Sequence, residues 1–335
     1  RGVMNRPLWT ASSPICVIPS AWTLKRDGKE IKSVNLKLFT VELVCLDDWK
    51  RWVPRPGNHI DFKVKVKPDS ISAETFHFYL QDTTSYEGKC MNYPKSYPST
   101  SADLTCSNHP DGYALDIDSD GQHASNTIGD ISEQKIRIDV SDGAAWGKLV
   151  CEAKIDMDQE GDGTTYQYVN AVFTTTGKES VKIPKDDQPD GGNKIADAWG
   201  HDGEIKDDAD DPPNNSTRPD WQEGDGLSRW EEYRGFALDE DTYTKTNPNV
   251  RNAFIYREKT FIQTSMFGYK SDLDCYQVAE DKVKQAEGDG EGLDAPPYII
   301  NFNQGEAPIA IEDQAALHIY LDEGGNVAGR GNIGF

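Results

Sequence analysis

The chain has 335 residues, of which 36% are hydrophobic and 10% aromatic, and it carries a formal charge of −22. This length predicts two or three domains, and the apolar content excludes a wholly disordered chain. Nucleic acid and anionic membranes would repel such a chain, so neither is an expected partner, and cations are favoured instead. No apolar run approaches the roughly 18 residues of a spanning helix, so no membrane insertion is predicted.

The six cysteines lack the paired CxxC spacing of zinc sites and redox dithiols, and they indicate disulfides instead. They are Cys16, Cys45, Cys90, Cys106, Cys151 and Cys275. The local pair Cys90 and Cys106 is the one bridge that the spacing favours, and a bridge between Cys45 and Cys151 is left open. Disulfides predict an oxidising setting, extracellular or at the cell surface.

The first part of the chain is patterned as strands, because apolar and polar residues alternate or β-branched and aromatic residues dominate. The predicted strands are 34–46, 59–68, 75–82, 135–140, 146–157 and 164–173. Six or seven strands with no convincing helix between them predict a mainly β fold. Residues 1–184 are therefore expected to form an immunoglobulin-like β-sandwich.

The composition changes after residue 184. Residues 186–241 hold 18 acidic against 5 basic residues, a net charge of −13 out of the chain's −22. Frequent Pro, Gly and Asn predict a mostly irregular backbone, so 185–241 is expected to be an acidic calcium-binding connector. One helix start stands out in LSRWEEYRGF, where Ser228 and Glu231 have capping-box spacing.

Hydrophobic patterning returns in residues 242–335, which are expected to form a small α/β unit. NAFIYREKTFIQTSMF begins it, DCYQVAEDKVKQA has the spacing of an amphipathic helix, and YIINFN and AALHIYL are strand-like. The glycine-rich end, GGNVAGRGNIGF, predicts a loop.

The stretch DIDSDGQ places three aspartates at alternate positions before a glycine, an arrangement that can converge oxygen ligands on calcium. Asp116, Asp118 and Asp120 are the candidate ligands there. The position that would hold the twelfth-place Glu of an EF-hand is Thr127, so a calcium-bound β-loop is the form expected. The alternative is an ordinary hairpin turn with solvated acids.

Two further sets of candidate ligands lie in the acidic connector. The first is Asp187, Asp190, Asn193 and Asp197; the second is Asp220, Glu223, Asp225, Glu231 and Glu232. In the second set, Asp225 and Glu232 occupy places five and twelve of an EF-hand-like loop, with Asp220 substituting for Trp221 at its start. The alternative is a plain helix N-terminus. Carboxylates about 5 Å apart repel by roughly 3 kcal/mol at an effective dielectric of 20, so an ordered segment needs a compensating cation.

Several of these runs together resemble a known class of protein. DVSDGAAWGKLVCEAKI, VKIPKDDQPDGGNKIADAWG, GDGLSRWEEYRGF and TNPNVRNAFIYRE are similar to large secreted bacterial proteins. In that class an immunoglobulin-like domain leads into a thrombospondin type 3-like or EF-hand-like calcium strip, and in several members a zinc-peptidase domain follows. The resemblance covers about residues 135–260. It departs from the family at Trp199, which Gly200 follows in place of the usual acid.

The sequence thus predicts a secreted, disulfide-bonded, calcium-stabilised structural or adhesive protein without catalytic activity. Its expected partners are calcium ions, copies of itself, and cell-surface or matrix components. The six histidines include no HExxH pair, and no nucleophile elbow or phosphate loop is present. One alternative is the non-catalytic front portion of a secreted zinc metallopeptidase. Weaker alternatives are carbohydrate binding through Trp49, Trp52, Tyr93 and Tyr97, or a transition metal at His201.

Overall fold

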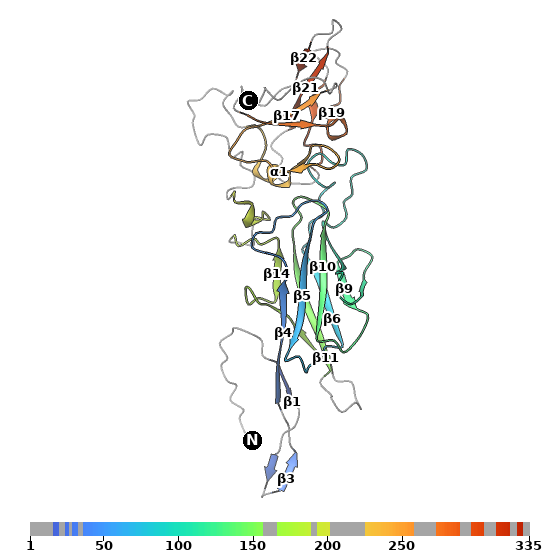
Figure 1. The fold of residues 1–335 in the computed structure, drawn as a ribbon, viewed down its shortest axis with the longest axis vertical. Helices are drawn as coiled ribbons and strands as arrows, with labels where there is room; N and C mark the ends of the chain where they lie inside the picture. The colour runs from blue at the N-terminus through green and yellow to red at the C-terminus, as the bar shows by residue number, and fades with distance from the viewer. Residues whose placement is uncertain are drawn as a thin grey trace.

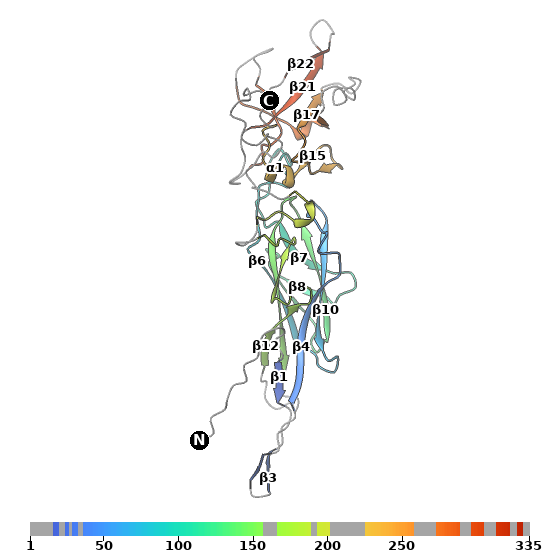
Figure 2. The ribbon, with the colours of Figure 1, turned by 90° about the vertical axis from the view of Figure 1, so that its left-hand side faces the viewer.

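The computed structural model describes residues 16–19, 24–26, 29–32, 36–156, 166–188, 193–201, 225–257, 273–288, 296–304, 313–321 and 327–330. Within these ranges the protein is mainly β, as the sequence predicts. Two sheets form the body of the molecule, and a second unit with its own sheet lies at one end of them (Figures 1 and 2). No described helix is long and apolar enough to cross a membrane.

The first sheet has six strands. Its order is β1 (Cys16–Pro19), β4 (Leu36–Cys45), β5 (His59–Lys67), β10 (Glu133–Val140) and β7 (Leu104–Asn108), with β13 (Val172–Phe173) beside β4. Neighbours are antiparallel except β13, which runs parallel to β4. A separate hairpin, β2 (Leu24–Arg26) with β3 (Lys29–Lys32), lies at the end away from the second unit (Figure 1).

The second sheet faces the first. Its order is β12 (Tyr166–Asn170), β11 (Gly147–Asp156), β6 (Thr75–Gln81), β9 (His123–Asn126) and β8 (Leu115–Ile117), with β14 (Ser180–Ile183) beside β11. Strict alternation explains the packing: the odd-numbered residues 147–155 of β11 are buried and the intervening ones are partly exposed. One apolar cluster joins inward residues of both sheets, including Phe62 and Phe78, so the two sheets share a single core.

The second unit is built on a six-stranded mixed sheet. Its order is β18 (Asp274–Val278), β17 (Asn252–Arg257), β21 (Ala315–Leu321), β20 (Tyr298–Ile299) and β19 (Lys284–Gln285), with β22 (Val327–Arg330) beside β21. Before it come the short helix α1 (Arg229–Arg234) and the pair β15 (Phe236–Ala237) and β16 (Tyr243–Thr244). Two 3-10 turns, η2 (Asp197–Trp199) and η4 (Glu280–Lys282), complete the described elements.

Two predictions for residues 242–335 are wrong. The expected amphipathic helix at DCYQVAEDKVKQA is strand β18, turn η4 and strand β19, because Asp274–Val278 pairs in parallel with the buried strand β17. The expected glycine-rich loop contains β22, which pairs with β21. The described part of 242–335 is therefore sheet, and the only α-helix that the structure describes, α1, precedes it in the acidic region.

The structure does not join the predicted pair Cys90 and Cys106. Cys90 and Cys106 are both buried free thiols, and Cys45 and Cys151 are free as well. Cys106 packs in the core between the sheets, whereas Cys90 lies in a loop beyond the sheets, 3.5 Å from the Asn92 side chain. Burial raises the pKa of the Cys90 thiol to about 11 and that of Cys106 to about 12.

A second apolar cluster joins parts of the chain that the sequence assigns to three different regions. It contains Met91 and Ala144 from the first region, Ile195 and Trp230 from the acidic region, and Phe254 from the last. The described acidic residues are therefore not an independent spacer. They pack into the same core as the C-terminal sheet, and two loops of the sandwich close that core from the other side.

Candidate functional site

Helix α1 is the centre of the site because one of its faces contacts a group of buried acids and the other contacts the sandwich. All six of its residues are buried, although four of them are charged. The predicted capping box is confirmed: Ser228 Oγ accepts from Glu231 N at 3.2 Å, and Glu231 Oε2 accepts from Ser228 N at 2.8 Å. Gly235 ends the helix with φ of 79° and ψ of −178°, a backbone conformation that favours glycine.

One side of α1 holds a buried acidic cluster, which we define as Asp225, Glu231 and Glu232. Their exposed fractions are 3%, 0% and 2%. Asp225 Oδ2 and Glu232 Oε1 each lie 2.9 Å from the side-chain nitrogen of Asn252. Glu231 Oε1 accepts from Asn301 Nδ2 at 2.8 Å, so strands and loops of the last region close around the cluster.

Asn252 contributes a further observation at this cluster. It is 0% exposed, and its side-chain nitrogen also lies 2.8 Å from Val250 O, so three oxygens surround a group with two hydrogens. Its Oδ1 has no hydrogen-bond partner. Rotation of the Asn252 side-chain amide by half a turn would exchange its nitrogen and oxygen. The oxygen would then lie beside the carboxylates of Asp225 and Glu232 and the carbonyl of Val250, which makes a set of four oxygens. Such a set of hard oxygens fits calcium, which takes 6–8 oxygen ligands.

The other side of α1 makes the joint between the second unit and the sandwich. Arg234 is 0% exposed, and its Nη2 lies 2.8 Å from Oδ2 of Asp142, which is also fully buried. The same guanidinium donates to Asn303 O and Glu87 O at 2.5 Å each. Asn92 pairs with Ala237 through two hydrogen bonds of 2.8 and 2.9 Å.

Asp103 lies in the same joint and gives it a pH dependence. Its carboxyl is 1% exposed, and burial together with the charge of Asp142 raises its pKa to about 7. The folded protein therefore holds a proton that the unfolded chain releases near pH 4. Stability therefore falls as pH rises from about 4 to about 7, and above that range the cost of the buried Asp103 carboxylate stays constant.

We expect Asp103→Asn to remove this fall, since an amide can keep accepting from Tyr86 N and carries no charge. The gain above pH 7 should be on the order of 2 kcal/mol, within the limit of about 1.4 kcal/mol per pKa unit. Urea unfolding at several pH values measures it. An exposed aspartate, Asp130→Asn, is the control. Parallel pH profiles for wild type and Asp103→Asn would contradict the assignment.

The predicted ligands of DIDSDGQ lie in the hairpin between β8 and β9, and all three are exposed. Gly121 N donates to Asp118 O, and Gln122 N donates to Asp120 Oδ1, which are bonds of an ordinary turn. Gly121 has φ of 69° and closes the turn. Over the described residues, no three His, Cys, Asp or Glu side chains converge as a metal site. Asp116, Asp118 and Asp120 remain predicted ligands, and the backbone is that of the hairpin alternative.

The first set in the acidic connector is held by a lysine. Lys185 Nζ contacts both Asp197 and Asp187, the latter at 2.5 Å, and Asn193 accepts only from its own loop, at Ile195 N. The ion pairs hold the pKa of Lys185 above its usual value against the opposing effect of burial. The sequence pattern alone does not show that a side-chain cation joins these aspartates. Asp190, Asp220 and Glu223 lie outside the described residues.

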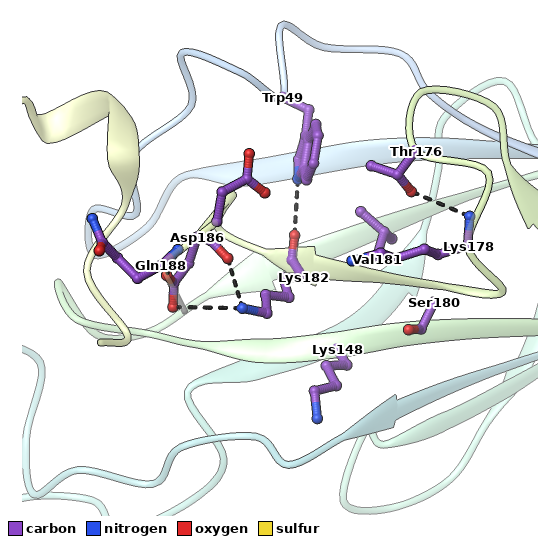
Figure 3. A pocket seen from close by; sticks show the side chains of 10 residues that line it. Trp49, Lys148, Thr176, Lys178, Ser180, Val181, Lys182, Asp186 and Gln188 are labelled. Atoms are coloured by element: carbon purple, nitrogen blue, oxygen red, sulfur yellow. Dashed lines mark hydrogen bonds and ion pairs between the residues drawn. The ribbon is translucent and has the colours of Figure 1, made fainter. Parts of the chain in front are cut away.

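A hollow of about 390 Å³ opens on the sandwich beside β14 (Figure 3). Lys148, Lys178 and Lys182 line it together with Trp49, whose indole Nε1 donates to Lys182 O at 2.8 Å. Lys148 pairs with Asp82 at 2.6 Å, and Lys182 donates to Asp186 O at the same distance. Lys148 and Lys182 thus each have an acidic or carbonyl partner beside the hollow.

Two of the four aromatic residues suggested for carbohydrate binding serve the fold instead. Trp49 is 6% exposed and packs edge-on against Phe173, and Trp52 packs on the same core. Tyr93 lies under the ammonium of Lys282 at 3.8 Å, and Tyr97 is exposed. His201 lies beside Trp199 and 3.2 Å from the Asn249 side chain, as a loop histidine does.

Comparisons with known proteins place the chain in no family: no family model matches it, and no curated protein matches it. Among solved structures, it is similar over 38% of its length to 90% of the human F-spondin reeler domain, at 10% identity and a TM-score of 0.24. It is also similar over 43% of its length to 97% of BslA, a bacterial hydrophobin, at 11% identity and a TM-score of 0.20. TM-scores this low support no statement about fold or function.

Proposed function

We propose that the chain is a calcium-stabilised structural or adhesive protein of the cell surface or extracellular space, without catalysis of its own. Its task would be to hold an immunoglobulin-like sandwich and the C-terminal sheet in a fixed relative orientation. The observation that supports this most directly is helix α1, whose two faces connect the buried acidic cluster to the joint. The expected partners are calcium, copies of the chain and surface or matrix components.

The supporting argument is one of charge and linkage. The acidic cluster places three carboxylates at 3% exposure or less around Asn252 and Asn301, and removing carboxylates from water is unfavourable unless other groups compensate. A divalent ion there would be held by the carboxylates of Asp225 and Glu232 and the side-chain oxygen of Asn252, and it would supply two positive charges. Because Arg234 belongs to the same six-residue helix, an ion that stabilises α1 would also stabilise the joint.

Calcium is therefore expected to raise the thermal stability of the protein. Binding to the folded state alone adds about 2.7 kcal/mol at a hundredfold excess over Kd. Calorimetric melting in calcium and in EDTA measures the shift, and Asp225→Asn and Glu232→Gln should each abolish most of it. Glu240→Gln, an exposed acid in the following turn, is the matched control. Superimposable melting curves of the wild type in calcium and EDTA would refute the proposal.

Orientation provides the second readout. In calcium, small-angle scattering should match the extended shape of the structure. In EDTA the distance distribution should be broader, since weakening α1 would let the sandwich and the second unit move relative to one another. Negative-stain images of the same samples show whether copies assemble.

A further inference from the structure

The outer face of the second sheet presents two histidines that the proposed function does not use. On β6, Phe76, Phe78 and Leu80 point into the core, so His77 and Tyr79 face outward. On β9, Ala124 is buried and His123 faces outward. The register pairs Tyr79 with His123 and His77 with Ser125, so the two histidines are diagonal neighbours across the strand pair.

The two imidazoles meet through their nitrogens. His77 Nδ1 lies 3.2 Å from His123 Nε2, and the rings are inclined by 12° with their centroids 5.5 Å apart. Two metal–nitrogen bonds of about 2.0–2.1 Å would span that separation at an angle of about 100°, near the tetrahedral value. Both side chains are partly exposed, so each ring can turn about χ2 to aim its lone pair at one point.

The surroundings favour the protonation states that a metal needs. Asp118 Oδ2 lies 3.4 Å from His123 Nδ1, which favours the proton on Nδ1 and leaves the lone pair on Nε2. Carboxylates placed in this way behind a histidine support its ligating nitrogen in many metal sites.

The other close histidine pair in the described residues lacks these features. His59 and His109 both approach Asp61, at 3.9 and 3.4 Å, but Arg137 already donates two hydrogen bonds of 2.9 Å to that carboxylate. A permanent cation thus occupies the position where an ion would compete.

We propose that His77 and His123 form a binding site for a divalent transition metal of the zinc, nickel and copper class, with Asp118 as the positioning residue. Imidazole suits these metals and not calcium, so the site is independent of the acidic cluster. No third His, Cys, Asp or Glu in the described ranges converges with them, so the ion would keep positions open to water or to a group from a partner. Glu152, opposite His77 on β11, is the nearest carboxylate in register.

The test is calorimetric titration of the full, untagged chain with nickel chloride in a non-coordinating buffer at neutral pH. We expect one nickel ion per chain at this site, displaced by zinc and not by calcium, and lost at acid pH because the imidazoles must be neutral. His77→Ala and His123→Ala should each weaken binding at least about tenfold, and Asp118→Asn, an exposed and structurally mild change, about tenfold.

His59→Ala is the control and should leave the titration unchanged. Unfolding curves show whether the alanine variants are folded, and Asp118→Asn provides the result if they are not. Failure of the wild type to bind nickel or zinc would overturn the proposal. So would binding that His77→Ala, His123→Ala and Asp118→Asn all leave unchanged.

Discussion

Replacement of Arg234 by alanine is expected to destabilise the protein by about 3–5 kcal/mol, as the loss of one partner from a buried ion pair does. The change removes donors to Asp142, Asn303 and Glu87, and leaves the Asp142 carboxylate buried without its guanidinium. It also removes a cation from above the rings of Tyr86 and Trp230, 5.4 and 5.5 Å away. Urea unfolding measures the loss.

Two variants make this result interpretable. Arg51→Ala removes an 88% exposed arginine from an ion pair with Asp48, and it should change stability by less than about 0.5 kcal/mol. Asp142→Asn combined with Arg234→Met removes both charges and should recover part of the loss. If Arg234→Ala behaves like Arg51→Ala, the ion pair does not hold the joint.

The second large effect is expected at Gly143, where the sandwich backbone touches α1. A Cβ there would overlap the carbonyl of Arg234 and the hydroxyl of Tyr243, and both neighbours are fixed because that hydroxyl donates to that carbonyl at 2.6 Å. Overpacking of this kind costs about 1–3 kcal/mol, and rigid backbone on one side places Gly143→Ala near 3. Gly143 O also accepts from Nζ of the partly buried Lys245 at 2.6 Å, so the shift would disturb a second contact.

Gly129→Ala is the matched control, because its Cβ would meet Glu74 O only at an ordinary 3.5 Å. The two variants differ in what the methyl group meets, so equal unfolding free energies would show that the sandwich and α1 are not in tight contact. A loss confined to Gly143→Ala would place the contact energy at this one point.

The strands that the sequence predicts correctly are those whose side chains alternate between a core and solvent over many residues, such as β5, β10 and β11. The short strands β7, β8, β9 and β14 are not predicted, since three to five residues with polar outer faces give little periodic signal. Residues 274–286 show the opposite error. Their helical spacing is real, but pairing with β17 and burial of Val278 and Val283 decide the outcome, and these contacts are invisible locally.

The candidate sites also differ in how much of each can be predicted from a local sequence pattern. The capping box at Ser228 and Glu231 is a local pattern and could be predicted, and the burial of Asp225, Glu231 and Glu232 follows from it only with the help of Asn252 and Asn301. His77 and His123 lie 46 residues apart, and only the pairing of β6 with β9 brings them together. The sequence feature that could have indicated this pair is a histidine at an outward-facing position on each of two strands.

The second apolar cluster can form only after residues far apart in the sequence have all been synthesised. Met91, Asn92 and Ala144 leave the ribosome long before α1 and β17, yet they are buried only when those elements arrive. Until then, the end of the sandwich presents apolar side chains and an unpaired Asp142 to its surroundings, a surface on which nascent chains can associate wrongly. Elements made later therefore complete a surface made earlier, and slow synthesis between Ala144 and β17 would prolong the time for which this surface is exposed.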